Sequence, residues 1–271
     1  MLNPPFIFRI RFYIVGIAWL SSLMLESCQE GIELNFVNQP VVSISLDEEL
    51  DEISALCVYK DQLAAVQDEK GTIFLFNLIE KSSKELIKFK ERGDFEGLAF
   101  DGNNFFVLGS NGDIFQVDSN GGYRRFTFQA KHKKKYDFEG LTYDPKGNQL
   151  LVLCKKHGNK KQDSYLWIYR FDLMKKQYLE EPFLKIQKSV FNKNLKASAI
   201  HLQNDDLWLL SASTHQLVHL NTDGNLIKIT QLDRDLYPQA EGICITSDNL
   251  IYIATEKKHN RAAFIHQLNQ D

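Results

Sequence analysis

The sequence is short of cysteine, of net charge and of long apolar runs, and each shortage excludes a class of protein. Four cysteines in 271 residues do not make the disulfide framework of a small secreted domain. The formal net charge is −3, so the overall balance indicates neither a nucleic-acid partner nor an acidic one. The chain is nevertheless 44% hydrophobic, with 19 Phe and 10 Tyr, which is enough to form a sizeable folded core.

The N-terminal segment is typical of a bacterial export signal. Arg9 and Arg11 precede an uncharged run at 12–25, which is the basic-then-apolar order of a secretory signal. With 14 residues this run is short for a membrane-spanning helix, which needs about 20 residues. It ends in LESC at 25–28, which resembles the bacterial lipobox, where the signal is cut and the cysteine is lipidated.

These features predict three parts of the chain. Residues 1–27 form a signal peptide of the lipoprotein type, 28–38 a tether, and 39–271 the folded domain. Acyl chains on Cys28 would give a stable membrane anchor, and Gln29 favours the outer membrane, so we expect a lipid-anchored protein of the bacterial cell envelope. The alternative is an uncleaved signal anchor in which Cys28 is incidental.

No stretch of the domain has the pattern of a convincing amphipathic helix, but one phrase repeats. DFEGLAF at 94–100 recurs as DFEGLTY at 137–143, and AEGICI carries the same acid and glycine at 241–242. Two weaker copies, SAL at 54–56 and SAI at 198–200, bring the number of repeats to five, spaced by 42, 43, 59 and 43 residues. A recurring spacing of about 43 residues indicates a repeat architecture, and the longer third unit carries an insertion at 155–163 and a longer tail near 174–195.

Each copy is followed by short apolar strands separated by Asp, Asn, Gly and Pro turns. About four strands per unit of this length predict an all-β fold, a five-bladed β-propeller with four-stranded antiparallel blades. The last unit has only three strands, so we expect PVVSISL at 40–46 to supply its fourth strand and close the ring. The insertion KKHGNKK at 155–161 is expected to form an exposed hairpin extension.

The remaining cysteines lie inside the apolar strands, where we expect small buried residues. They are Cys57, Cys154 and Cys244. A Cys57–Cys244 pair stays possible, because these two cysteines occupy matching places in two repeats.

The repeated acids should converge on the propeller axis, because the first strand of each blade lines the central channel. Glu96, Glu139 and Glu241 hold one equivalent position, and Ser54 and Ser198 complete that ring. A second tier lies two residues earlier, on the same side of each strand. Its members are Glu52, Asp94, Asp137, Lys196 and Gln239.

Three carboxylates in one channel repel one another. Either some of them are protonated, with a raised pKa, or a cation neutralises them. Oxygen ligands without His or Cys suit Ca²⁺, which accepts six to eight oxygens. The alternative is that each glutamate only bonds to neighbouring backbone N–H groups, while the glycine beside it permits close strand packing.

The phrases DFEGLAF, DFEGLTY, LDEISAL and YPQAEGI, followed by NLIYIATE, resemble the SdiA-regulated (YjiK-like) family of exported bacterial β-propellers. The similarity runs from about residue 38 to the C-terminus. The resemblance implies a five-bladed propeller, distantly related to propellers of NHL repeats, with a calcium site. Its implied ligands are Glu96, Glu139 and Glu241, with Glu256 in the TE that ends a second strand as a further candidate.

Two functions follow as hypotheses, and the sequence leaves open whether the protein is an enzyme. The first is a calcium-stabilised binding module of the envelope, acting as a monomer on an unknown protein or small-molecule ligand. The alternative is a calcium-dependent hydrolase of phosphatase or lactonase type, in which the channel metal would activate water. No G-x-S-x-G motif and no readable Ser-His-Asp arrangement supports a nucleophilic enzyme.

Overall fold

The computed structural model describes residues 34–37, 40–130, 133–191 and 195–268. The chain divides into two units, Met1–Gly31 and Ile32–Asp271, and only the second contains described residues. The predicted signal peptide and Cys28 therefore lie outside the part of the chain that is described here. Within the described part, no helix has the length and apolar character needed to cross a bilayer.

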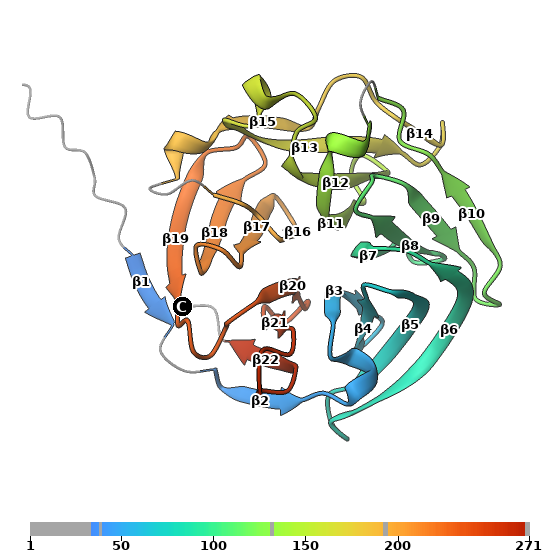
Figure 1. Ribbon diagram of the computed structural model, residues 1–271, viewed down its shortest axis with the longest axis vertical. Helices are drawn as coiled ribbons and strands as arrows, with labels where there is room; N and C mark the ends of the chain where they lie inside the picture. The colour runs from blue at the N-terminus through green and yellow to red at the C-terminus, as the bar shows by residue number, and fades with distance from the viewer. Residues whose placement is uncertain (1–33, 38–39, 131–132, 192–194, 269–271) are drawn as a thin grey trace, which may run out of the picture. The chain divides into compact units, whose positions relative to one another are not determined.

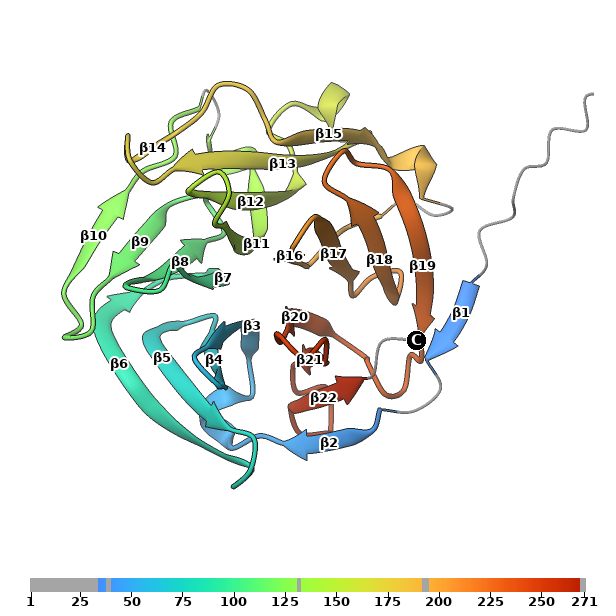
Figure 2. The same cartoon turned by 180° about the vertical axis from the view of Figure 1, so that it is seen from behind.

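The described part of the second unit is an all-β, five-bladed propeller, as the repeat predicted (Figure 1). Its blades follow one another around the ring in chain order (Figure 2). Blade 1 comprises β3 (Ile53–Tyr59), β4 (Gln62–Gln67), β5 (Lys70–Asn77) and β6 (Ser82–Arg92). Blade 2 comprises β7 (Phe95–Phe100), β8 (Phe105–Gly109), β9 (Ile114–Val117) and β10 (Tyr123–Phe126).

Blades 3 and 4 each carry one more strand than the prediction. Blade 3 comprises β11 (Asp137–Asp144), β12 (Gln149–Lys156) and β13 (Tyr165–Asp172), with β14 (Gln177–Tyr178) and β15 (Leu184–Gln187) pairing with different parts of β13. Blade 4 comprises β16 (Ala199–Gln203), β17 (Asp206–Ser211), β18 (Gln216–Asn221) and β19 (Leu226–Leu232), with β1 (Leu34–Val37) outside β19. Because β1 runs parallel to β19, the last part of the expected tether pairs with the propeller.

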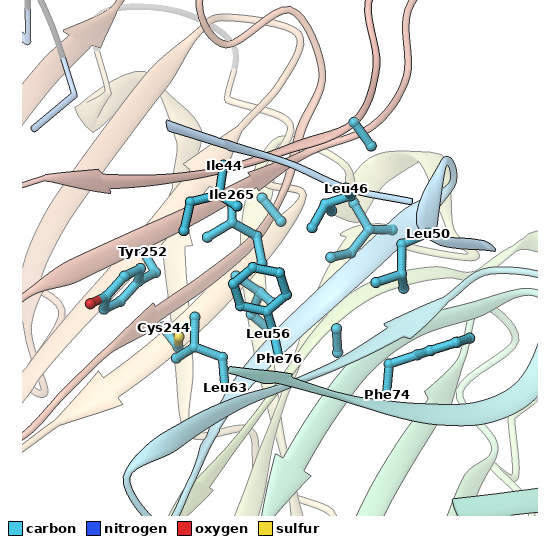
Figure 3. Packing of buried hydrophobic residues seen from close by; sticks show 14 residues of the cluster. Ile44, Leu46, Leu50, Leu56, Leu63, Phe74, Phe76, Cys244, Tyr252 and Ile265 are labelled. Carbon is cyan, nitrogen blue, oxygen red and sulfur yellow. The ribbon is translucent and has the colours of Figure 1, made fainter. Parts of the chain in front are cut away.

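The N-terminal segment closes the ring, which confirms the prediction for 40–46. Blade 5 comprises β20 (Ala240–Ile245), β21 (Ile251–Thr255), β22 (Phe264–Leu268) and, as its outer strand, β2 (Val42–Ser45). Ile44 and Leu46 from this segment pack with Leu50, Leu56 and Phe76 into the core between blades 5 and 1 (Figure 3). Closure therefore removes an open strand edge and buries apolar surface at the same place.

The three cysteines of the described residues are free and buried, as expected for small core residues. Cys244 belongs to the core between blades 5 and 1, whereas Cys57 belongs to the core between blades 1 and 2. Burial raises the pKa of the Cys57 thiol well above its usual value, and the nearby Cys244 raises this pKa further. These thiols are therefore structural rather than reactive.

The strand directions define one face of the propeller. Because the strands of a blade alternate in direction, first and third strands begin at the end where second and fourth strands finish. The connections from second to third strand and from fourth strand to the next blade therefore lie at this end, which we call the loop face. The connections from third to fourth strand lie at the opposite face.

The glycines of the repeated phrase lie where the first strands of neighbouring blades meet. A Cβ atom at Gly97 would lie 2.7 Å from the Cβ of Leu141 and 2.9 Å from its backbone nitrogen. At Gly140 the nearest atoms belong to Ile200, at 3.0 Å, and at Gly242 the backbone nitrogen of Leu56 is 3.2 Å away. Glycine is thus required where the first strands of neighbouring blades approach each other, which agrees with the close-packing role that the sequence analysis gave as an alternative.

We expect Gly97→Ala to destabilise the propeller by about 1–3 kcal/mol, because the added methyl group overpacks the contact between blades 2 and 3. Urea unfolding would measure the loss. Gly242→Ala is the matched comparison and should cost less, since its closest contact is 3.0 Å, to the Cβ of Ala254. Equal losses at both positions, or none at Gly97, would contradict the packing explanation.

Candidate site at the channel mouth

In four of the five blades, a β-bulge near the start of the first strand directs one side chain out of the regular pairing. In blade 2, Phe95 pairs with Gly109 and Gly97 with Leu108, so Glu96 between them is the extra residue. Blades 1, 3 and 5 have the same irregularity at the equivalent residue. A bulge re-aims a side chain and locally ends regular pairing. The bulge residues are Ser54, Glu96, Glu139 and Glu241.

The three predicted glutamates meet at the axis, as the repeat indicated. They share one small cavity of about 10 Å³, which is lined by residues of all five first strands. These strands, β3, β7, β11, β16 and β20, surround the centre of the ring in Figure 1. The cavity is about the volume that one water molecule needs. The space that Glu96, Glu139 and Glu241 share therefore holds about one water molecule.

Burial at this point changes the acidity of all three carboxyl groups. Burial, with the charges of Glu139, Asp94 and Glu241, raises the pKa of Glu96 to about 10. Burial raises the pKa of Glu241 to about 8 and that of Glu139 to about 7. Oε2 of Glu241 is buried and has no hydrogen-bond partner among the described residues. Protonation is thus one way in which the channel limits repulsion between its acids.

Repulsion between the acids is also limited by a lysine, Lys155, which the sequence analysis expected in an exposed hairpin. Lys155 Nζ lies 2.9 Å from Oε1 of Glu139, and the two side chains are 30% and 8% exposed. Burial would lower the pKa of Lys155, but Glu139, Glu241 and Asp137 together raise it above its usual value. The prediction that 155–161 forms an exposed hairpin is therefore wrong for Lys155. This residue belongs to strand β12, and its side chain reaches Glu139.

Both serines of the ring make hydrogen bonds to the backbone. Ser54 Oγ donates to the carbonyl of Val66 at 3.3 Å, and Ser198 Oγ donates to the carbonyl of Ala240 at 2.7 Å. Ser198 Oγ also accepts a hydrogen bond from the backbone N–H of Ala212 at 3.2 Å. In blades 1 and 4, the equivalent position thus stabilises strand contacts and brings no charge to the axis.

The predicted second tier lies beside the acids that it was expected to accompany. Asp94 raises the pKa of Glu96, and Asp137 raises that of Glu139. Gln239 Nε2 donates a hydrogen bond to Oε2 of Glu256. Burial, and then the charges of Asp68 and Glu52, raise the pKa of Glu256 to about 7. The channel mouth therefore contains further acids besides the three glutamates that line the small cavity.

Asp68 and Lys155 are the residues that sequence reasoning missed at this site. Each directly follows the second-strand residue that pairs with the residue before the bulge, as Glu256 does. The backbone N–H groups of Asp68 and Glu256 donate to the carbonyls of Glu52 and Gln239, respectively. The repeats thus hold a second equivalent position at the ends of the second strands. Aligning those ends would have found it: Asp68, Ser110, Lys155, Ala212 and Glu256.

The acids of the channel mouth are the ligands that the sequence analysis expected for a calcium ion. Their oxygens are of the type that Ca²⁺ prefers. However, among the residues that the structure describes, no three acidic, histidine or cysteine side chains lie where they could share one metal ion. Lys155 already supplies a positive charge to Glu139. The assignment of Glu96, Glu139, Glu241 and Glu256 as calcium ligands stays a prediction that this geometry does not support.

A larger cavity of about 750 Å³ lies away from the channel, on the rim between blades 2 and 3. Its walls include Phe126, Phe128, Tyr136, Tyr169 and Tyr178. These rings contact one another: Phe128 is 5.2 Å from Tyr136 and 5.0 Å from Tyr178 between centroids. The aromatic residues therefore serve first as packing between the two blades.

Comparisons with known proteins agree with the fold. The sequence model of the SdiA-regulated family matches residues 45–260. A comparison with curated proteins finds no match. Glutaminyl cyclase from Myxococcus xanthus is 13% identical, with 86% of this chain and 97% of that chain covered and a TM-score of 0.59. The PQQ-bound aldose sugar dehydrogenase from Streptomyces coelicolor is 8% identical, with 84% of this chain and 96% of that chain covered and a TM-score of 0.57. At these identities the structural likeness concerns the fold alone.

We expect Glu96→Gln to stabilise the protein at pH 8. The raised pKa means that folding protonates Glu96 at pH values between about 4.5 and 10, so the stability of the wild type falls as the pH rises through this range. Glutamine removes this cost, and the gain should grow with pH by on the order of 1 kcal/mol per pH unit above pH 4.5. Thermal unfolding at pH 5 to 8 would measure it.

Glu180→Gln is the control, because it removes the same charge from an exposed acid outside the channel. It should show no comparable dependence on pH. A calcium site would give the opposite result for Glu96→Gln: the variant would be less stable than the wild type in calcium, and a chelator would remove that difference.

Proposed function

The chain belongs to the SdiA-regulated family, and on that premise we propose that it is a binding module of the bacterial cell envelope. In this proposal a lipid on Cys28 anchors a monomeric propeller, with the outer membrane as its location. The loop face takes a protein or small-molecule ligand, and nucleic acid is not a partner.

The observation that carries the proposal is a pair of charged cavities on the loop face. One has about 410 Å³ and lies where the loop into β3 meets the β4–β5 connection. Its lining is mostly acidic: Glu48, Glu49, Asp51, Glu52, Gln67, Glu69, Lys70 and Lys257. The other has about 450 Å³ and lies in the connections of blades 4 and 5. Concave sites with converging polar groups are the usual places for ligands.

The small space among the channel acids favours binding over hydrolysis. A hydrolase that uses a channel metal needs an ion with an open coordination position and room for the substrate beside it. Here the acids surround a cavity of about 10 Å³, and Lys155 is paired with Glu139. The geometry therefore supports ligand contact at the loop face, and no observation favours the hydrolase as a second proposal.

Site-specific photo-crosslinking in intact cells tests the role of the loop face. A photoreactive phenylalanine analogue at Glu69 or His259, both exposed on this face, should give discrete adducts. The matched controls are Ile79 and Met174, which are 92% and 80% exposed in connections of the opposite face. These positions should give none. Adducts of equal yield from both faces, or from the control positions alone, would refute the proposal.

Cys28→Ser tests the anchor separately. Without its lipid, the protein should move from the membrane fraction to the soluble fraction, because the acyl chains supply the apolar surface that holds it in a bilayer. Cell fractionation followed by immunoblotting would show the change, with Cys154→Ser as the control for loss of a thiol. Continued retention of the Cys28 variant in membranes would indicate an uncleaved signal anchor instead.

A further inference from the structure

The second cavity of the loop face is built mainly from basic side chains. Three connections meet there: the turn between β17 and β18, the loop from β19 to β20, and the turn between β21 and β22. They contribute His215, Arg234, Lys258, His259 and Arg261 to a cavity of about 450 Å³. Asp235 is the one acidic residue in its lining. Residues far apart in the sequence thus form a single positively charged hollow.

The hairpin that carries two of these cations is fixed in place. Lys258 and Arg261 pair backbone to backbone, with N···O distances of 3.2 and 3.1 Å. His259 between them adopts a positive φ of 56°, which makes the turn tight. Lys258 Nζ donates to the carbonyl of Pro238 at 3.3 Å, and Arg261 Nη1 donates to the carbonyl of Asp235. Both side chains are therefore held against the loop from β19 to β20.

Carbonyl partners position these cations but leave their charges uncompensated. Among the ion pairs of the described residues, none involves Arg234, Lys258 or Arg261. Arg234 is also exposed, so its guanidinium can reach a ligand without breaking a contact in the fold. Three basic side chains against the single carboxylate of Asp235 give the lining a formal net charge of about +2, with the histidines counted as neutral.

We propose that this cavity binds a phosphate monoester group, an inference that rests on the proposed binding role of the loop face. A phosphate monoester carries a charge of about −1.5 to −2 at pH 7, which matches the cavity, whereas a carboxylate carries only −1. Guanidinium groups bind phosphate oxygens through paired N–H donors, and the two arginines provide such donors. The imidazoles of His215 and His259 add polar contacts beside them.

Titration of the full chain in a neutral detergent with inorganic phosphate tests the proposal. At constant ionic strength set with chloride, phosphate should raise the melting temperature of the wild type in a saturable manner. Arg234→Gln should weaken this binding at least about tenfold, and its melting temperature in chloride alone should stay unchanged, because the side chain is exposed. Arg124→Gln removes an exposed arginine from β10 in blade 2 and should bind as the wild type does.

The proposal is overturned if phosphate has no saturable effect on the wild type, or if the two arginine variants behave alike. A second titration with monomeric dihexanoyl phosphatidic acid distinguishes the sources of the phosphate group. If dihexanoyl phosphatidic acid binds at least tenfold more tightly than inorganic phosphate, and Arg234→Gln abolishes this binding, the ligand is a lipid headgroup. If the two probes bind with equal affinity, the ligand is a soluble monoester. If the loop face gives crosslinked adducts but phosphate does not bind, the phosphate proposal is wrong and the proposed binding function stands. If the loop face gives no adducts, the proposed binding function itself is wrong.

Discussion

The close approach of neighbouring first strands at the axis is the contact on which the other features depend. Gly97 and Gly140 bring their strands against Leu141 and Ile200 at distances that a side chain would not allow. The same approach leaves a cavity of only about 10 Å³ between the first strands and buries the acid that precedes each glycine. The contact therefore requires the glycine, and it buries the acid that precedes it.

Burial of the acids then determines the electrostatics of the channel mouth. Carboxylates that lose their water shell are stabilised by protons or by a positive charge close by. The channel uses both: the pKa of Glu96 rises to about 10, while Lys155 lies 2.9 Å from Glu139. A lysine held in strand β12 thus provides the kind of charge for which the sequence analysis invoked a calcium ion.

The sequence allowed the architecture to be predicted because a repeat copies one local geometry five times. Strand spacing, the closing strand at 40–46 and the convergence of the three glutamates all follow from that periodicity. Lys155 was missed because it stands near the end of an apolar strand, where two other repeats have an acid, and beside a basic insertion that was expected to be solvent-exposed. Pairing of β1 with β19 depends on a strand edge that exists only after blade 4 has formed. The basic cavity depends on three connections that no sequence period relates.

Two blades show that the fold itself does not need the acids. Ser54 occupies the same bulge as Glu96, and Ser198 holds the equivalent place in blade 4, yet both satisfy their hydroxyl groups on backbone carbonyls. A serine at this position closes the ring without any uncompensated charge. The glutamates instead require protons and Lys155, which makes them a cost to stability that the fold could avoid. Blade packing therefore accounts for the glycines of the repeat but not for the acids beside them.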